Sequence, residues 1–170
     1  MDARRESEPT PMKNRTTVER TSEREFVVTR TFDGPARLVF EAWTKPDLLK
    51  LWWVPKSTGM SMLSCEADVR VGGTYRFVFS HPAYPEPMAF FGRYIEVTPH
   101  SRLVWTNEEG AGGEAVTTVT FEEKAGKTLL VLHEVHPSKE AVDDAIGFGE
   151  GLRETFEELD ELLVTWGSSR

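Results

Sequence analysis

Few residues of this 170-residue sequence have types and spacing that could do chemistry, and the most suggestive group is His133-Glu134-Val135-His136. Histidine and glutamate are ligand types that zinc accepts in proteins. This group ends a β-rich run, however, and residues three apart on a strand point to opposite faces. A zinc site of the HExxH type needs its two histidines four apart on a helix. We therefore predict no metal site here.

Two other segments also receive structural interpretations. Cys65 is the single cysteine and has no basic neighbour in the sequence, so we expect a small buried residue rather than a nucleophile. The glycines of segment 147–151 do not follow a strand of a βαβ unit, so they indicate a flexible start of a helix, which could also gate a cavity, and not a nucleotide site. No serine, histidine and acid are joined by a nucleophile-elbow motif. We predict no catalytic residue and no cofactor.

The composition excludes further classes. The chain carries 28 acidic and 20 basic residues, a net charge of -8, and this acidic balance argues against a nucleic-acid partner. No apolar run is long enough for a membrane span, and charged residues rather than an apolar segment follow Met1. One cysteine cannot form an internal disulfide framework. We expect a cytoplasmic protein with no membrane partner.

The elements that must position any site follow from the apolar patterning. Residues 1–22 are almost entirely polar and are expected to form a disordered tail, ahead of a single domain over 23–170. A strand over 26–32 precedes two short helices near 35–43 and 48–53. Six further strand-like runs cover 60–68, 74–80, 88–97, 102–107, 115–123 and 128–135.

A long helix closes the chain. Ser138 can cap its start, and the pattern is firm from Gly151 onward. Its apolar stripe consists of residues spaced by four, three, four and three positions: Leu152, Phe156, Leu159, Leu163 and Trp166. From 138 to 170 nine acidic residues face three basic ones, so about three quarters of the net charge lies here; we expect these charges on the outer side of the helix.

These elements predict an α+β fold. Short connections imply a curved antiparallel sheet of about six to seven strands, with two short helices after the first strand. The sheet can bury its inner face only by wrapping on the long C-terminal helix. A single helix does not fill a strongly curved sheet, so the layout implies a cavity between the two.

The same segments resemble the heat-shock protein 90 ATPase activator-like family, a branch of the START/SRPBCC superfamily. The resemblance spans about 25–166 and rests on an ordered set of motifs: Arg30–Pro35 with Val39–Pro46, Leu51–Pro55, Cys65–Gly73, Gly92–Val97 and Arg102–Thr106. It implies the helix-grip fold, shared with START domains and with birch-pollen-allergen-like (Bet v-like) proteins. The co-chaperone activity of larger members involves an additional domain for which this chain has no room. The chain also departs from the family at Gly151-Leu152, where a tryptophan often follows the glycine.

Aromatic and apolar residues supply the candidate ligand contacts. The tryptophans near the second short helix either plug the open end of the sheet or face the cavity. Strand alternation places further residues on the inner face. The candidate cavity-lining residues are Trp52, Trp53, Tyr75, Phe77, Phe79, Phe91, Arg93, Ile95, Trp105, Phe148, Leu152 and Phe156. Arg93 shares a face with Phe91 and Ile95; alternatively, the strand register or a bulge turns it outward, or it pairs with an acid such as Glu66.

Three functions remain open from the sequence. The leading hypothesis is a non-catalytic or weakly catalytic protein that holds a small hydrophobic or amphipathic molecule in the cavity. The second is a cyclase- or hydrolase-like enzyme acting on a hydrophobic substrate, with acid–base candidates Glu66, Tyr75, Arg93, Tyr94 and His133. The third is an interaction protein that assists a chaperone, and a homodimer is also left open.

Overall fold

A computed structural model describes residues 15–54, 59–109 and 113–168. In these ranges the chain forms one eight-stranded sheet and three helices, an α+β fold. The elements are, in order, β1 (Thr17–Ser22), β2 (Glu25–Phe32), α1 (Ala36–Thr44), α2 (Pro46–Trp52), β3 (Ser61–Ala67), β4 (Thr74–Ser80), β5 (Met88–Thr98), β6 (Arg102–Asn107), β7 (Ala115–Lys124), β8 (Lys127–Val135) and α3 (Lys139–Ser168).

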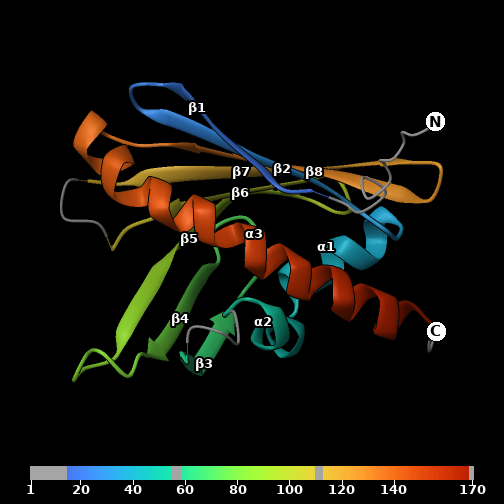
Figure 1. The fold of residues 1–170 in the computed structure, drawn as a ribbon, viewed down its shortest axis with the longest axis horizontal. Helices are drawn as coiled ribbons and strands as arrows, with labels where there is room; N and C mark the ends of the chain where they lie inside the picture. The colour runs from blue at the N-terminus through green and yellow to red at the C-terminus, as the bar shows by residue number, and fades with distance from the viewer. Residues whose placement is uncertain (1–14, 55–58, 110–112, 169–170) are drawn as a thin grey trace, which may run out of the picture.

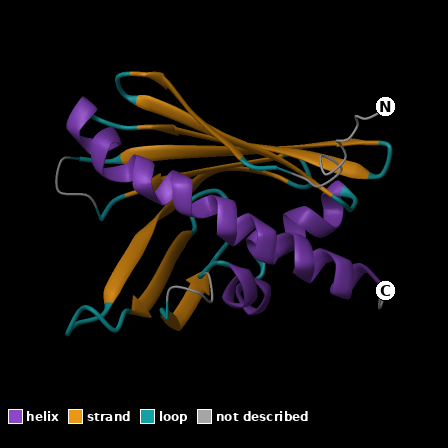
Figure 2. Cartoon of the chain, in the orientation of Figure 1, coloured by secondary structure: helices purple, strands orange, loops and turns teal. Residues whose placement is uncertain are grey.

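The sheet is antiparallel throughout, in the order β1-β2-β8-β7-β6-β5-β4-β3. It divides into two parts that lie on either side of α3: β1, β2, β8, β7 and β6 above the helix, and β4 and β3 below it (Figure 1). Figure 2 shows the same helix running diagonally across the opening of the bent sheet. This arrangement matches the expected sheet wrapped on a C-terminal helix.

Strand β5 joins the two parts of the sheet. Its first half, 88–93, pairs with β4, and its second half, 94–98, pairs with β6. Gly92 lies at the change of partner, where a Cβ atom would come within 2.0 Å of the Thr106 carbonyl oxygen. Only glycine allows the two backbones to approach so closely at this bend.

Two expectations about the strands need correction. Residues 17–22, assigned to the disordered tail, form the edge strand β1, which pairs with β2 from Thr17↔Thr29 to Ser22↔Glu25. The sheet therefore has eight strands rather than six or seven. The sequence of β1 is almost entirely polar because its side chains are mostly exposed, and backbone pairing rather than apolar burial holds it in place. Residues 1–14 lie outside the described ranges.

Helix α3 packs its predicted stripe into the core. Leu152, Phe156, Leu159 and Leu163 are all buried, which confirms that part of the stripe; the side chain of Trp166 lies outside the described ones. The helix begins at Lys139, with the Ser138 hydroxyl accepting a hydrogen bond from the Ala141 amide at 3.1 Å. Segment 147–151 therefore lies inside one continuous helix.

One acidic residue of α3 points inward, against the expectation of a wholly solvated charged face. Arg30 of β2, only 5% exposed, donates to Asp160 at 2.9 Å and to the Thr16 hydroxyl at 3.0 Å. Charged groups are rarely buried without a partner of opposite charge. Asp160 thus joins the last turns of α3 to the inner face of β2.

We expect Asp160→Ala to lower the free energy of unfolding by about 3 kcal/mol, because it leaves the Arg30 guanidinium buried without its counter-ion. Urea unfolding followed by circular dichroism measures the change. The control is Glu161→Ala, an exposed residue next to it on α3, which should stay within about 0.5 kcal/mol of the parent. Equal losses in both variants would contradict a role for the buried pair.

Candidate functional site

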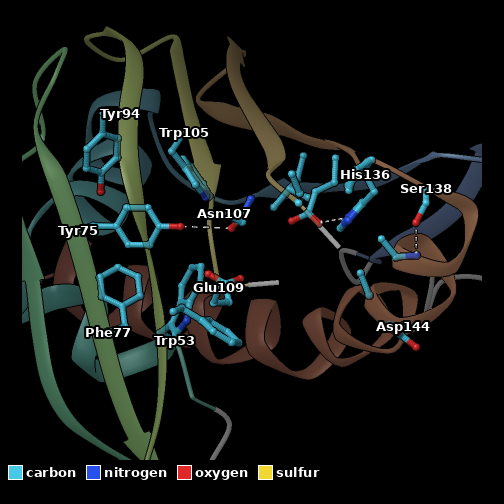
Figure 3. Close-up of a pocket in the computed structure, with 18 of the residues that line it drawn as sticks. Trp53, Tyr75, Phe77, Tyr94, Trp105, Asn107, Glu109, His136, Ser138 and Asp144 are labelled. Carbon is cyan, nitrogen blue, oxygen red and sulfur yellow. Dashed lines mark hydrogen bonds and ion pairs between the residues drawn. The ribbon is translucent and has the colours of Figure 1, made fainter. Parts of the chain in front are cut away.

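A cavity of about 440 Å³ lies in the bend of the sheet, under the first half of α3. Its walls come from α1 and α2, from strands β4 to β8 and from one face of α3 (Figure 3). The described lining residues are Trp43, Leu49, Trp53, Tyr75, Phe77, Phe90, Tyr94, Trp105, Asn107, Glu109, Gly113, Ala115, Leu132, Glu134, His136, Pro137, Ser138, Glu140, Ala141, Asp144 and Ala145. The volume falls in the range of ligand pockets in proteins.

Aromatic rings form one end of the cavity. Tyr75 and Phe77 project from β4 with ring centroids 5.2 Å apart, and Trp53 meets Phe77 at 5.5 Å. Trp105 of β6 lies 6.4 Å from Tyr94 of β5. These contacts have the tilted and edge-on geometries that aromatic pairs prefer, so the rings hold one another in place around the open space.

A chain of hydrogen bonds links the aromatic end to the polar end. The Tyr75 hydroxyl lies 2.7 Å from the Thr106 carbonyl and 3.3 Å from Asn107 Oδ1. Asn107 Nδ2 donates to the Thr117 hydroxyl at 2.7 Å, and that hydroxyl donates to Glu134 at 3.0 Å. The chain ends where the second oxygen of Glu134 meets His136 Nε2 at 2.9 Å. Figure 3 shows Tyr75 and His136 at opposite sides of the view.

Strand register explains this polar chain. Asn107 ends β6, and Thr117 of β7 lies directly opposite Glu134 of β8. Glu134 shares the inner face of β8 with Leu130 and Leu132, and is itself buried. A buried carboxylate is costly unless it is hydrogen-bonded, so Thr117 and His136 stabilise Glu134 in this wall.

The environment of the cavity shifts the pKa values of three lining groups, those of Tyr75, Tyr94 and Glu109, and for Tyr94 the main cause is burial, which raises the pKa. Burial raises the pKa of the Tyr75 hydroxyl, and the nearby carboxylates of Glu109 and Glu134 add to the effect. Glu109 is exposed at the rim, but loss of solvent around its carboxyl group raises its pKa, with smaller contributions from the charges of Glu134 and Glu108. The amide of Phe91, which donates to Glu109 at 3.2 Å, acts in the opposite direction.

The structure places the predicted lining residues in four groups. Trp53, Tyr75, Phe77 and Trp105 line the cavity. Trp52, Phe79, Leu152 and Phe156 are buried in the surrounding core and do not line it. The side chain of Phe148 is outside the described ones. The remaining three, Phe91, Arg93 and Ile95, lie on the opposite face of β5.

The prediction for β5 was therefore wrong by one residue in phase. Phe91 and Ile95 are 40% and 46% exposed, whereas Phe90 and Tyr94 line the cavity. Arg93 also faces outward, where it pairs with Glu108 and, at 3.0 Å, with Glu114 rather than with Glu66. The residues of β5 that face inward include Gly92. This position has to be glycine because a side chain would collide with the backbone of β6.

The polar wall was not predicted from the sequence. Glu134 and His136 attracted attention only as part of a possible metal motif, and Asn107 and Glu109 were not among the candidates. The alternation Leu130, Leu132, Glu134 along β8 was the available signal, because it places Glu134 on the apolar face. His133, as expected, points away from His136, pairing with Glu25 at 2.8 Å on the outer face. Among the described residues no three His, Cys, Asp or Glu side chains are grouped to hold a metal ion.

Cys65 of β3 lies outside this cavity. It is buried opposite Phe77 of β4, as the sequence predicted, and burial raises the pKa of its thiol to about 11. It is therefore a packing residue with little thiolate at neutral pH.

The architecture and the cavity together define the fold class of this protein. A curved antiparallel sheet that encloses one long C-terminal helix, with space between them, is the helix-grip fold. The family model described as "Activator of Hsp90 ATPase homolog 1-like protein" matches residues 33–164, and the chain belongs to that family.

Solved structures agree on the fold. A protein from Rhodobacter sphaeroides superposes with a TM-score of 0.79 at 23% identity, covering 88% of this chain and 98% of its own. A Nitrosomonas europaea protein gives 0.75 at 26% identity, covering 86% and 98%. A Mycobacterium smegmatis protein gives 0.74 at 21% identity, covering 88% and 98%. The comparison with curated proteins gives no match. Of the helices in the described ranges, none is long and apolar enough to cross a membrane.

We expect Thr117→Val to lower the free energy of unfolding by about 1–2 kcal/mol. The substitution keeps the shape of the side chain but removes an acceptor from Asn107 and a donor from Glu134. Thermal unfolding by calorimetry measures it. The control is Thr118→Val on the outer face of the same strand, which we expect to be near neutral. A near-neutral Thr117→Val would show that the polar chain adds no stability.

We expect Cys65 to react with iodoacetamide at pH 8 about 100-fold more slowly in the folded protein than in urea. The reason is that burial raises the pKa of the thiol from 9.0 to about 11, which lowers the fraction of reactive thiolate. Mass spectrometry follows the single adduct. The unfolded thiol loses its proton at lower pH than the folded one, so the thiol should also make stability fall as the pH rises from about 9 to about 11. Equal rates in both states would contradict burial of the thiol.

Proposed function

We propose that this protein binds a small hydrophobic or amphipathic molecule in the cavity between the sheet and α3. The observation that carries the proposal is the 440 Å³ space with seven phenylalanine, tyrosine and tryptophan side chains in its wall. Those residues are Trp43, Trp53, Tyr75, Phe77, Phe90, Tyr94 and Trp105. Apolar burial contributes about 25 cal/mol per Å², so such a wall favours a ligand with a flat apolar body.

An amphipathic ligand fits better than a purely apolar one. The Trp43 side chain is 3% exposed and lines the cavity, and its indole N–H has no hydrogen-bond partner among the described residues. An unpaired buried donor costs free energy, and an acceptor atom on a ligand would remove that cost. The carboxylates and the imidazole at the other end favour a second polar group.

A second candidate function is acid–base catalysis on the bound molecule. It rests on the Glu134–His136 hydrogen bond inside the cavity, because a carboxylate that orients an imidazole is a common arrangement for proton transfer. This pair replaces the acid–base candidates suggested by the sequence, of which Tyr75 and Tyr94 line the cavity. The two functions differ in whether the ligand leaves the protein unchanged.

We expect Ala145→Phe to weaken binding of the neutral dye N-phenyl-1-naphthylamine at least tenfold. Ala145 lines the cavity from α3, so the added ring occupies the space of the ligand without removing a wall residue. Dye fluorescence, which rises in an apolar site, measures the affinity.

The matched control is Ala83→Phe, which adds the same ring in an exposed loop away from the cavity and should leave dye binding unchanged. Circular dichroism and melting temperature verify that both variants fold. A parent protein that does not bind the dye or any member of a panel of lipids and aromatics in native mass spectrometry would refute the proposed function.

A further inference from the structure

We propose that the cavity selects organic cations: molecules with an aromatic or alkyl body and an ammonium group. This inference rests on the proposed binding function and names its ligand class. It follows from the kind of charge in the wall and from where that charge lies relative to the aromatic rings.

The ionisable groups of the wall are strongly biased in sign. Four carboxylates line the cavity, from Glu109, Glu134, Glu140 and Asp144. The described lining residues include no lysine and no arginine, and the one basic side chain, His136, already bonds Glu134. Two phenol groups, Tyr75 and Tyr94, keep their protons because burial raises their pKa values.

Basic side chains from neighbouring segments have partners elsewhere. Lys139, next to Glu140 in the chain, donates to Asp143 at 3.2 Å. Arg93 of β5 pairs with Glu114 on the outer face of the sheet. Arg24 donates to the Pro137 carbonyl at 3.3 Å. None of the three lines the cavity, so a cation from outside remains the natural counter-charge.

Most of the carboxylates lie away from the aromatic end of the cavity. In Figure 3, Tyr75, Phe77 and Tyr94 lie on one side, His136 and Asp144 lie on the other, and Glu109 lies between them beside Trp53. Glu109, Glu140 and Asp144 are exposed, so they mark the side on which the cavity meets solvent, whereas Glu134 is buried. A ligand that inserts its apolar body among the rings therefore leaves its polar group near the carboxylates.

Two physical effects then favour a positive group. An ammonium ion loses part of its hydration at the rim, and nearby carboxylates offset that loss more effectively than neutral acceptors do. Ring faces of tryptophan and tyrosine also attract cations, so Trp53 and Trp105 tolerate a charge that reaches deeper. An anion would face four carboxylates without a lysine or arginine among the described lining residues to pair with.

The wall itself responds to this negative field. After burial, the next cause that raises the pKa of Tyr75 is the charge of Glu109, and the charges of Glu134 and Glu108 raise that of Glu109. Tyr75 on β4 and Glu109 in the segment after β6 thus experience the same sign of potential. A cation in the cavity would offset this negative potential, whereas an anion would make it more negative.

The test compares three naphthalenes of nearly equal shape: 2-(1-naphthyl)ethylamine, 2-(1-naphthyl)ethanol and 1-naphthylacetate. Calorimetry at pH 7 and low salt measures each affinity directly. We expect the amine to bind at least tenfold more tightly than the alcohol, and the acetate more weakly than the alcohol. Added salt should reduce the advantage of the amine, because the carboxylates at the rim are exposed.

A pair of matched double variants assigns the effect to the cavity. Glu140→Gln with Asp144→Asn removes two carboxylates from the lining face of α3, and should lower the affinity for the amine at least fivefold without changing that for the alcohol. Glu150→Gln with Glu161→Gln removes two carboxylates from the same helix outside the cavity, and should leave both affinities unchanged.

The outcomes separate the two proposals. Equal affinities for the amine and the alcohol, or tighter binding of the acetate, overturn cation selection and leave the binding function standing. Equal losses in both double variants also overturn it, because they assign the effect to the net charge of the chain. Failure of all three compounds to bind a protein that does bind the neutral dye overturns cation selection and leaves the binding function standing.

Discussion

The bend of the sheet at Gly92 is the constraint on which the rest of this structure depends. Strand β5 has to pair with β4 over its first half and with β6 over its second, and the backbone of Gly92 passes against the Thr106 carbonyl where the partners change. Because of this bend the two parts of the sheet lie on either side of α3 instead of packing flat against it. One helix cannot fill the space between the two parts of the sheet, and the unfilled space is the cavity.

The two parts of the sheet contribute different kinds of side chains to the wall of the cavity. The β4 and β5 side supplies Tyr75, Phe77 and Tyr94, whereas the β7 and β8 side supplies Glu134, which Thr117 holds from behind the wall. One part presents a face of aromatic side chains, and the other presents a row of hydrogen-bonded polar side chains. Their meeting at the bend produces a pocket with an apolar end and an acidic end.

The fold could be predicted well from the sequence because it depends on apolar residues that repeat regularly along whole helices and strands. The stripe from Leu152 to Leu163 and the alternation of Tyr75, Phe77 and Phe79 each allow one interpretation. The phase of β5 could not be read, because both of its faces carry aromatic residues and Gly92 gains its meaning only from a carbonyl group on another strand. The polar wall was missed for the same reason: Asn107, Thr117 and Glu134 come together through strand register, which no local motif records. Strand β1 was missed because its polar side chains carry no sign of the backbone pairing that orders it.

The edge strand β1 has a practical meaning for work with this protein. It covers the outer edge of β2 and also contacts α3, since Arg20 donates to Asp143 at 2.6 Å; just before β1, the Thr16 carbonyl accepts a hydrogen bond from Arg153. An expression variant that starts near Glu23, which the polar composition of the first residues invites, would expose the eight-residue edge Glu25–Phe32. Exposed edges recruit strands from other molecules. A dimer or an aggregate of such a shortened chain would therefore result from the missing strand, and would not show how the chain that keeps β1 assembles.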